Sequence, residues 1–259
     1  TFDDSFCTPI QTPLQVADSG ALVWDEHCDV LIISWGAAGA CAALEARAQG
    51  ADVLIADRFT GGGASAKSGG VVYAGGGTRH QQAAGYNDTP EAMFDYLKHE
   101  TRNVVSDDTL RRFCADSVSN LQWLESHGAP YGHRMPPGGK TSYPPDGYFL
   151  YYSGNELVPQ HGGPLPPAPR GHRTVGKGQC GAVLYGHLKA ACLRAGARPL
   201  LQAAAKRLVV DAQGCVLGAE LWCMPPDSAQ AQLHARLAAR AERLQNFAPG
   251  YCRKLRERI

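Results

Sequence analysis

The stretch Asp29-Val-Leu-Ile-Ile-Ser-Trp-Gly-Ala-Ala-Gly39 decides the fold, together with the two segments that follow it. It begins with a continuous apolar run of the kind found in buried parallel strands. Residues 40–49 are rich in alanine and favour a helix, which Gly50 ends. A second apolar run, Asp52-Val-Leu-Ile-Ala56, predicts another buried strand. Because the connection between the two strands is a helix, the stretch predicts a βαβ unit with parallel strands.

The turn between the first strand and the helix resembles the G-x-G-x-x-G dinucleotide fingerprint, although Ser34 replaces its first glycine. Gly36 would let the backbone approach a pyrophosphate, and Gly39 would let helix and strand pack closely. The helix N-terminus offers partial positive charge to the phosphates. Asp57 ends the second strand, where a carboxylate can accept hydrogen bonds from a ribose diol. If Ser34 has a positive φ, it costs about 1 kcal/mol.

A second glycine-dense loop favours a flavin over a nicotinamide dinucleotide. Residues 60–78 contain Gly61-Gly-Gly-Ala-Ser-Ala-Lys-Ser-Gly-Gly70, directly after the acidic strand end. A nicotinamide enzyme has no evident need for this loop, whereas the longer flavin dinucleotide extends past the first turn. Bare backbone could approach the flavin there, and Ser65 and Ser68 offer hydroxyl groups.

With these motifs, the sequence resembles the flavoproteins grouped around fumarate reductase and the 3-oxosteroid dehydrogenases. The resemblance covers residues 22–225, and the glycine motifs are its most specific part. It implies that FAD is held by Gly36, Ala37, Ala38, Gly39, Asp57, Arg58, Ser65, Ser68, Gly69 and Gly70, with backbone near Ala205 meeting the adenine. Members with a histidyl-linked flavin carry His where this chain has Gly62 or Gly63, so we expect non-covalent FAD.

The resemblance also implies the reaction. In the steroid-type members, a tyrosinate removes a proton beside a ketone while the flavin N5 takes a hydride from the neighbouring carbon. A tyrosine-rich stretch resembles the border of their steroid pocket, which makes four side chains pocket candidates: Tyr143, Tyr148, Tyr151 and Tyr152. We therefore expect an FAD-dependent dehydrogenase of the CH–CH type acting on a hydrophobic ketone, with 3-oxosteroid delta-1 dehydrogenation as the preferred reaction. The catalytic residues stay unassigned, and the base is expected outside this chain.

Two alternatives stay open. A fumarate-type enzyme would bind carboxylates through the Arg-Gly-His-Arg segment, which contains Arg170, His172 and Arg173. Alternatively, the chain is a non-catalytic FAD-binding fragment or subunit, because family members are longer and carry a second block that completes the FAD domain. In that case, the rest of the same protein or a second chain is its partner.

Composition excludes several other classes. Lys and Arg number 25 against 24 Asp and Glu, so the overall charge gives no reason to expect nucleic-acid binding. None of the nine cysteines forms a C-x-x-C pair, and the histidines lack ligand spacing, so we expect reduced thiols and no metal site. We expect a cytoplasmic protein, with peripheral membrane contact through the arginine-rich C-terminal helix as an alternative to a solvated helix face.

The predicted fold class is α/β: a Rossmann-like, FAD-binding parallel sheet with a helical and irregular appendage and the start of a second, substrate domain. The predicted division runs as follows: an N-terminal arm at 1–27, the FAD-binding βαβ core and helices at 28–128, a Pro/Tyr-rich pocket segment at 129–176, a return to the FAD domain at 177–225, and a helical insertion at 226–259.

Overall fold

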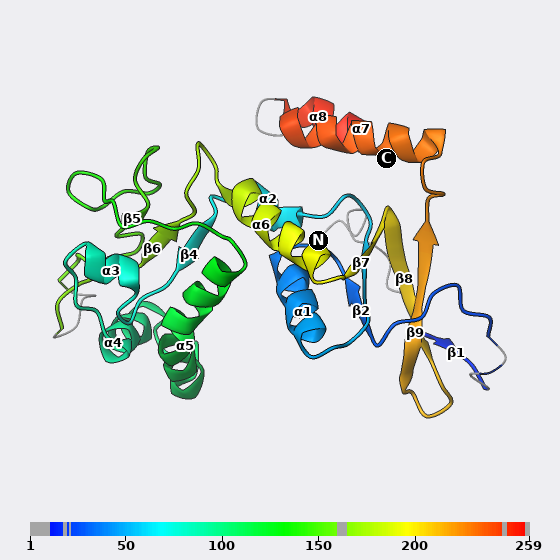
Figure 1. The fold of residues 1–259 in the computed structure, drawn as a ribbon, viewed down its shortest axis with the longest axis horizontal. Helices are drawn as coiled ribbons and strands as arrows, with labels where there is room; N and C mark the ends of the chain where they lie inside the picture. The colour runs from blue at the N-terminus through cyan, green and yellow to red at the C-terminus, as the bar shows by residue number, and fades with distance from the viewer. Residues whose placement is uncertain (1–10, 18–19, 21, 160–164, 245–247, 257–259) are drawn as a thin grey trace, which may run out of the picture. The chain divides into compact units, whose positions relative to one another are not determined.

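The fold is described from a computed structural model of the 259-residue chain. The structure describes all residues except 1–10, 18–19, 21, 160–164, 245–247 and 257–259. The chain forms two compact units (Figure 1), of which the first comprises residues 1–61 and 195–259 and the second residues 62–194. The functional division predicted from the sequence stays a prediction.

A three-stranded parallel sheet lies at the centre of the first unit. Its order is β2 (Val30–Ile33), β3 (Val53–Asp57) and β7 (Arg198–Leu201). Strand β2 aligns with β3 from Val30 opposite Val53, and helix α1 (Ala37–Ala48) connects these two strands. All five residues of β3 are buried, as expected for a central parallel strand. The α/β class and the parallel strands predicted from the sequence are confirmed.

The first unit also contains a β-hairpin and two helices. Strands β8 (Ala203–Val210) and β9 (Val216–Cys223) pair antiparallel and form this hairpin. The short β1 (Leu14–Gln15) pairs parallel with β8. Helices α7 (Ala229–Leu244) and α8 (Pro249–Arg256) pack side by side (Figure 1).

The second unit is mainly helical. It contains α2 (Gly63–Lys67), α3 (Arg79–Ala83), α4 (Pro90–Glu100), α5 (Asp107–Ser126) and α6 (Gly181–Arg194). The Thr89 and Ser106 side chains accept hydrogen bonds from backbone N–H groups in the first turns of α4 and α5, as N-caps do. Met93 and Phe94 of α4 pack with Leu110 and Cys114 of α5 in a buried cluster.

A small antiparallel sheet completes this unit. Strand β6 (Gly171–Arg173) lies between β4 (Val71–Tyr73) and β5 (Leu150–Tyr151). Apart from β5 and β6, the described part of the segment 129–176 has no helix or named strand, in agreement with its ten prolines among residues 129–170. None of the helices in the described ranges is both long and apolar enough to cross a bilayer. The cytoplasmic location and the peripheral membrane contact stay predictions.

Candidate functional site

The turn between β2 and α1 has the backbone of a close-approach site. Ser34 has φ = 86°, so the residue that replaces the first fingerprint glycine does adopt the strained conformation considered from the sequence. A Cβ on Gly39 would lie 2.1 Å from the Ser34 carbonyl oxygen, which leaves no room for any side chain. Helix α1 begins after Gly36, with neither a side-chain cap nor an acidic residue in its first turn. This described turn therefore presents a helix N-terminus suited to an anion.

Asp57 is fixed beside this turn by two backbone donors. The Trp35 N–H donates to Oδ2 at 2.8 Å, and the Phe59 N–H donates to Oδ1 at 2.8 Å. Asp57 is 8% exposed, and Trp35 is completely buried. Each carboxylate oxygen retains acceptor capacity for a further hydrogen bond, such as one from a ribose hydroxyl. The glycine contact, the helix N-terminus and the held carboxylate together fit the adenosine diphosphate half of a flavin dinucleotide.

Two further candidates of the first unit lie on its surface. Arg58 is exposed, and its guanidinium carbon lies 5.0 Å from the centre of the Phe59 ring. Ala205 is exposed on β8, where the pairing with β9 shifts between Ala205 and Arg207.

The glycine-dense loop of the second unit is more structured than the sequence indicated. Residues 63–67 form the helix α2, and Val71 begins β4, where a continuous loop was expected. The positive φ values of Gly61 (85°) and Gly62 (98°) turn the chain directly into this helix. At the other end, Gly70 has φ = 65° and lies so close to Cys180 that a Cβ would stand 2.5 Å from the Cys180 carbonyl oxygen.

The end of α2 is joined to the start of α6 by backbone contacts. Gly181 N–H donates to Ser68 O at 3.0 Å, and a Cβ on Gly181 would lie 2.4 Å from the carbonyl oxygens of Ser65 and Ser68. The Ser68 hydroxyl donates to Ser65 O at 2.8 Å and accepts from Gly70 N at 3.1 Å. This hydroxyl, a candidate ligand for FAD, therefore also shapes the loop.

Among the four candidate tyrosines, Tyr143 is the one that contacts this loop. Its hydroxyl lies 2.8 Å from Gly69 O and 2.9 Å from Gly178 O, which act as acceptors. The same oxygen accepts from Arg173 Nε at 3.0 Å. The Arg173 side chain is buried, and it also donates to Asp146 Oδ1 and to backbone carbonyls. Tyr143 and Arg173 thus fasten the glycine loop.

The other candidate tyrosines are placed differently. Tyr151 and Tyr152 are 3% and 6% exposed. Burial raises the pKa of both phenols. The Tyr152 hydroxyl donates to Pro167 O at 3.4 Å, which is a weak contact. Tyr148 is half-buried, with the Arg134 guanidinium over its ring. Their assignment as pocket residues stays a proposal.

The Arg-Gly-His-Arg segment is held in a buried polar network. Arg170 forms a two-point ion pair with Asp88, with distances of 2.7 and 2.9 Å and almost complete burial of both side chains. Burial alone would raise the pKa of Asp88, but the hydrogen bonds and charge of Arg170 outweigh it and lower that pKa. His172 lies 2.9 Å from the Thr78 hydroxyl and 3.1 Å from Arg170 O, and burial lowers its pKa to about 4. In this geometry the Arg170 guanidinium is already paired with the Asp88 carboxylate.

Sequence reasoning missed several residues of this network. Gln81 donates to Asp88 and to Pro169 O, and Glu156 is buried beside the Tyr73 hydroxyl, which donates to it at 3.3 Å. Burial raises the pKa of the Glu156 carboxyl. A buried Gln and Glu have no distinctive sequence signal, and Asp88 was covered only by the range 22–225 of the family resemblance.

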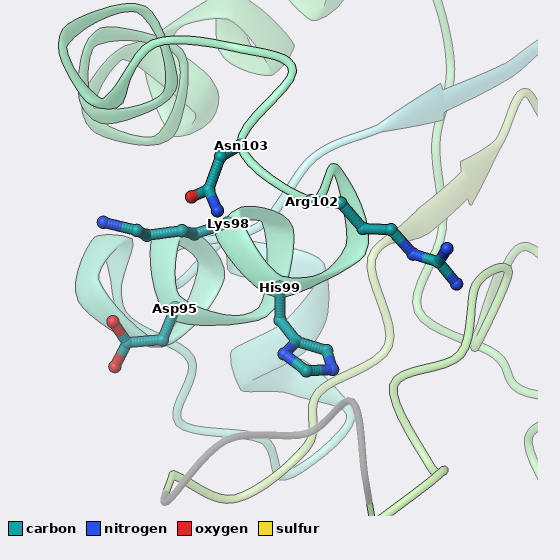
Figure 2. Close-up of a pocket in the computed structure, with 5 residues that line it drawn as sticks. All are labelled: Asp95, Lys98, His99, Arg102 and Asn103. Carbon is teal, nitrogen blue, oxygen red and sulfur yellow. The ribbon is translucent and has the colours of Figure 1, made fainter.

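A surface depression of the second unit lies elsewhere, at the C-terminal end of α4. Figure 2 shows the side chains that line it: Asp95, Lys98, His99, Arg102 and Asn103. Lys98 pairs with Asp107 at 2.7 Å on the adjoining helix. None of the residues predicted to bind FAD or substrate belongs to this depression.

Comparison with known proteins agrees with the geometry of the turn. The model of the FAD binding domain family matches residues 29–248. The chain belongs to this family. FAD is therefore its cofactor, and the chain is related to the 3-ketosteroid dehydrogenases.

Individual relatives make the relationship specific. Over 239 residues the chain is 49% identical to a 3-oxo-5-alpha-steroid 4-dehydrogenase of Comamonas testosteroni, covering 90% of this chain and 44% of that protein. A 3-oxosteroid 1-dehydrogenase of the same organism is 28% identical over 137 residues, which are 47% of this chain and 23% of that protein.

A solved structure gives the same relationship. The crystal structure of the 3-ketosteroid-delta4-(5alpha)-dehydrogenase of Rhodococcus jostii RHA1, in complex with 4-androstene-3,17-dione, has a TM-score of 0.74 and 32% identity, covering 82% of this chain and 44% of that one. The chain thus spans less than half the length of these relatives.

Proposed function

We propose that the protein containing this chain dehydrogenates the steroid ring next to the ketone of a 3-oxosteroid. The observation that carries the proposal is the 49% identity over 239 residues with a steroid 4-dehydrogenase, in a chain whose turn at 34–39 and Asp57 suit FAD. The sequence indicated delta-1 dehydrogenation. The greater identity to the 4-dehydrogenase than to the 1-dehydrogenase favours the bond between C4 and C5 instead.

In this proposal, the residues of the chain hold and orient the cofactor. The N-terminus of α1 and Gly36, Ala37, Ala38 and Gly39 meet the pyrophosphate, while Asp57 accepts hydrogen bonds from the adenosine ribose. Arg58 and the backbone at Ala205 lie along the adenosine, and Ser65, Ser68, Gly69 and Gly70 bind further along the non-covalent cofactor. When bound, FAD accepts the hydride that the substrate carbon loses. A Rossmann-like sheet and the beginning of a substrate domain belong to the same proposal.

The network in the second unit bears on the fumarate alternative. A dicarboxylate needs cations that are free to converge on it. Arg170 is already paired with Asp88, and the buried Arg173 side chain is paired with Asp146. These pairs favour a neutral ketone over a carboxylate substrate. We also propose that the rest of the same protein, or a second chain, completes the FAD domain, because this chain covers 44% of its steroid-dehydrogenase relative.

The experiment is anaerobic bleaching of the intact, flavin-loaded protein, with the product identified by mass spectrometry and NMR. The proposal expects bleaching by 5α-androstane-3,17-dione and formation of the 4-ene. Bleaching by 4-androstene-3,17-dione with formation of the 1,4-diene would instead establish delta-1 dehydrogenation. Bleaching by succinate alone would establish the carboxylate alternative, and bleaching by none of the three would contradict all of these reactions.

A further inference from the structure

A set of contacts in the first unit joins α7 to the turn that follows Asp57. The His234 ring of α7 stacks on the Phe59 ring, with centroids 5.5 Å apart and planes 12° from parallel. His234 is 8% exposed. Phe59 is also the residue whose N–H holds Asp57 Oδ1 at 2.8 Å. The stack therefore acts on the residue that orients the candidate ribose-binding carboxylate.

Gln202 makes a second connection between the same two segments. Its backbone N–H donates to Phe59 O at 3.0 Å. Its side-chain amide donates to Ala231 O at 2.7 Å and lies 2.9 Å from His234 Nδ1. Gln202 has φ = 53°, a backbone conformation uncommon for a non-glycine residue. These hydrogen bonds offset the free-energy cost of that conformation.

The hydrogen bonds also define the state of the imidazole. Ala231 O can only accept, so the NH2 group of the Gln202 amide must face it. The second proton of that NH2 group then points to His234 Nδ1, which must accept. His234 is therefore neutral with its proton on Nε2, and burial lowers its pKa accordingly. A neutral ring can remain stacked on Phe59 without a buried charge.

We propose that α7 acts as a clamp on the adenosine end of the FAD site, with His234 as a positioning residue for Asp57. This inference rests on the proposed contact between Asp57 and the ribose diol. His234 holds the Phe59 ring, Gln202 holds the Phe59 backbone, and Phe59 in turn holds the carboxylate. Residues more than 140 positions further along the chain thereby determine how well the carboxylate is oriented for the cofactor.

The test compares ligands with and without the diol. Binding of FAD is measured by quenching of flavin fluorescence, and ADP and 2′,3′-dideoxy-ADP are measured as competitors for the apoprotein. In His234→Ala, we expect the Kd for FAD to rise about tenfold, the scale of one lost aromatic pair. The preference for ADP over dideoxy-ADP should fall as well. A general loss of packing would weaken both nucleotides alike and leave this preference unchanged.

Two further variants serve as controls. His234→Phe retains an aromatic partner for Phe59 and should restore most of the affinity and preference. Leu233→Ala changes an exposed neighbour on the same helix, 48% accessible, and should behave as the unaltered protein. If circular dichroism shows that His234→Ala does not fold, Phe59→Leu removes the stack from its other side and should lower the same preference.

The outcomes separate the two levels of the proposal. If the unaltered protein does not prefer ADP to dideoxy-ADP, the proposed contact between Asp57 and the ribose is wrong. The proposed role of α7, which rests on that contact, is then overturned as well. If the preference exists and the folded variant that lacks the stack retains it, the clamp alone is overturned, whether the FAD affinity changes or not.

Discussion

Two glycine-rich segments of this chain look alike in sequence but are held in different ways. In the turn at 34–39, Gly39 is needed because α1 passes directly over the Ser34 carbonyl, a contact between residues five positions apart. In the loop at 61–70, Gly70 is needed because the backbone of Cys180 lies against it, 110 positions along the chain. The first segment is shaped by its own neighbours, and the second by residues that are distant in sequence.

This difference explains which features of the structure could be predicted from the sequence. The apolar runs, the turn and Asp57 lie within 29 residues, and periodicity with glycine spacing was enough to predict the parallel βαβ unit. The helix α2 inside the second loop was not predicted, since it depends on contacts with the start of α6. The fastening role of Tyr143 and the pairing of Arg170 with Asp88 likewise depend on tertiary contacts that no local pattern contains.

The largest expected effect comes from filling the close contact of the first segment. Gly39→Val would place side-chain atoms on the Ser34 carbonyl oxygen, 2.1 Å from the Cβ position. We expect a loss of about 3 kcal/mol or more in the free energy of unfolding, together with loss of bound flavin. Urea denaturation and the visible spectrum measure the two effects. Gly50→Ala meets no atom within 4 Å and should cost only about 1 kcal/mol through its positive φ. Equal losses for the two variants would contradict the importance of the contact.

The structure of the second segment should depend on Arg173, which is distant from it in the sequence. Arg173→Met removes the donor to Tyr143, Asp146 and several backbone carbonyls, and we expect a loss of about 3 kcal/mol because those acceptors lose their partner. Chemical denaturation measures the loss. The matched change Arg112→Met, at an exposed i,i+4 pair of α5, should cost less than about 1 kcal/mol. An Arg173→Met protein as stable as Arg112→Met would show that the loop at 61–70 keeps its structure without Arg173.

A pH dependence of stability should arise in the second unit's network. The pKa of His172 falls from 6.5 to about 4 on folding, so the unfolded chain binds the proton first. Stability from this group is therefore complete above pH 6.5 and is lost as the pH falls toward 4, by about 2 to 3 kcal/mol. His172→Gln should flatten the stability profile in this range, as measured by denaturation at several pH values. The same change at exposed His133 should leave the profile as it is, and an unaltered profile in His172→Gln would contradict the assignment.

The smallest effect concerns the strained position of the first segment. Ser34→Gly relieves the cost of φ = 86° and should raise the free energy of unfolding by about 1 kcal/mol. Thermal denaturation of the two proteins measures the gain. Ser119→Gly, inside α5, should lower stability by about the same amount because glycine is a poor helix former. A loss of stability in Ser34→Gly would mean that the serine makes a compensating interaction.

The most direct test of the account is the effect of Asp57 on FAD binding. FAD is titrated into the apoprotein of the unaltered chain and of Asp57→Ala, with circular dichroism to verify that both are folded. If the carboxylate held by Trp35 and Phe59 receives the ribose hydroxyls, the variant should bind FAD about 10 to 100 times more weakly, the loss of one or two hydrogen bonds to a charged group. An unchanged Kd in a folded variant would contradict the proposed placement of the cofactor.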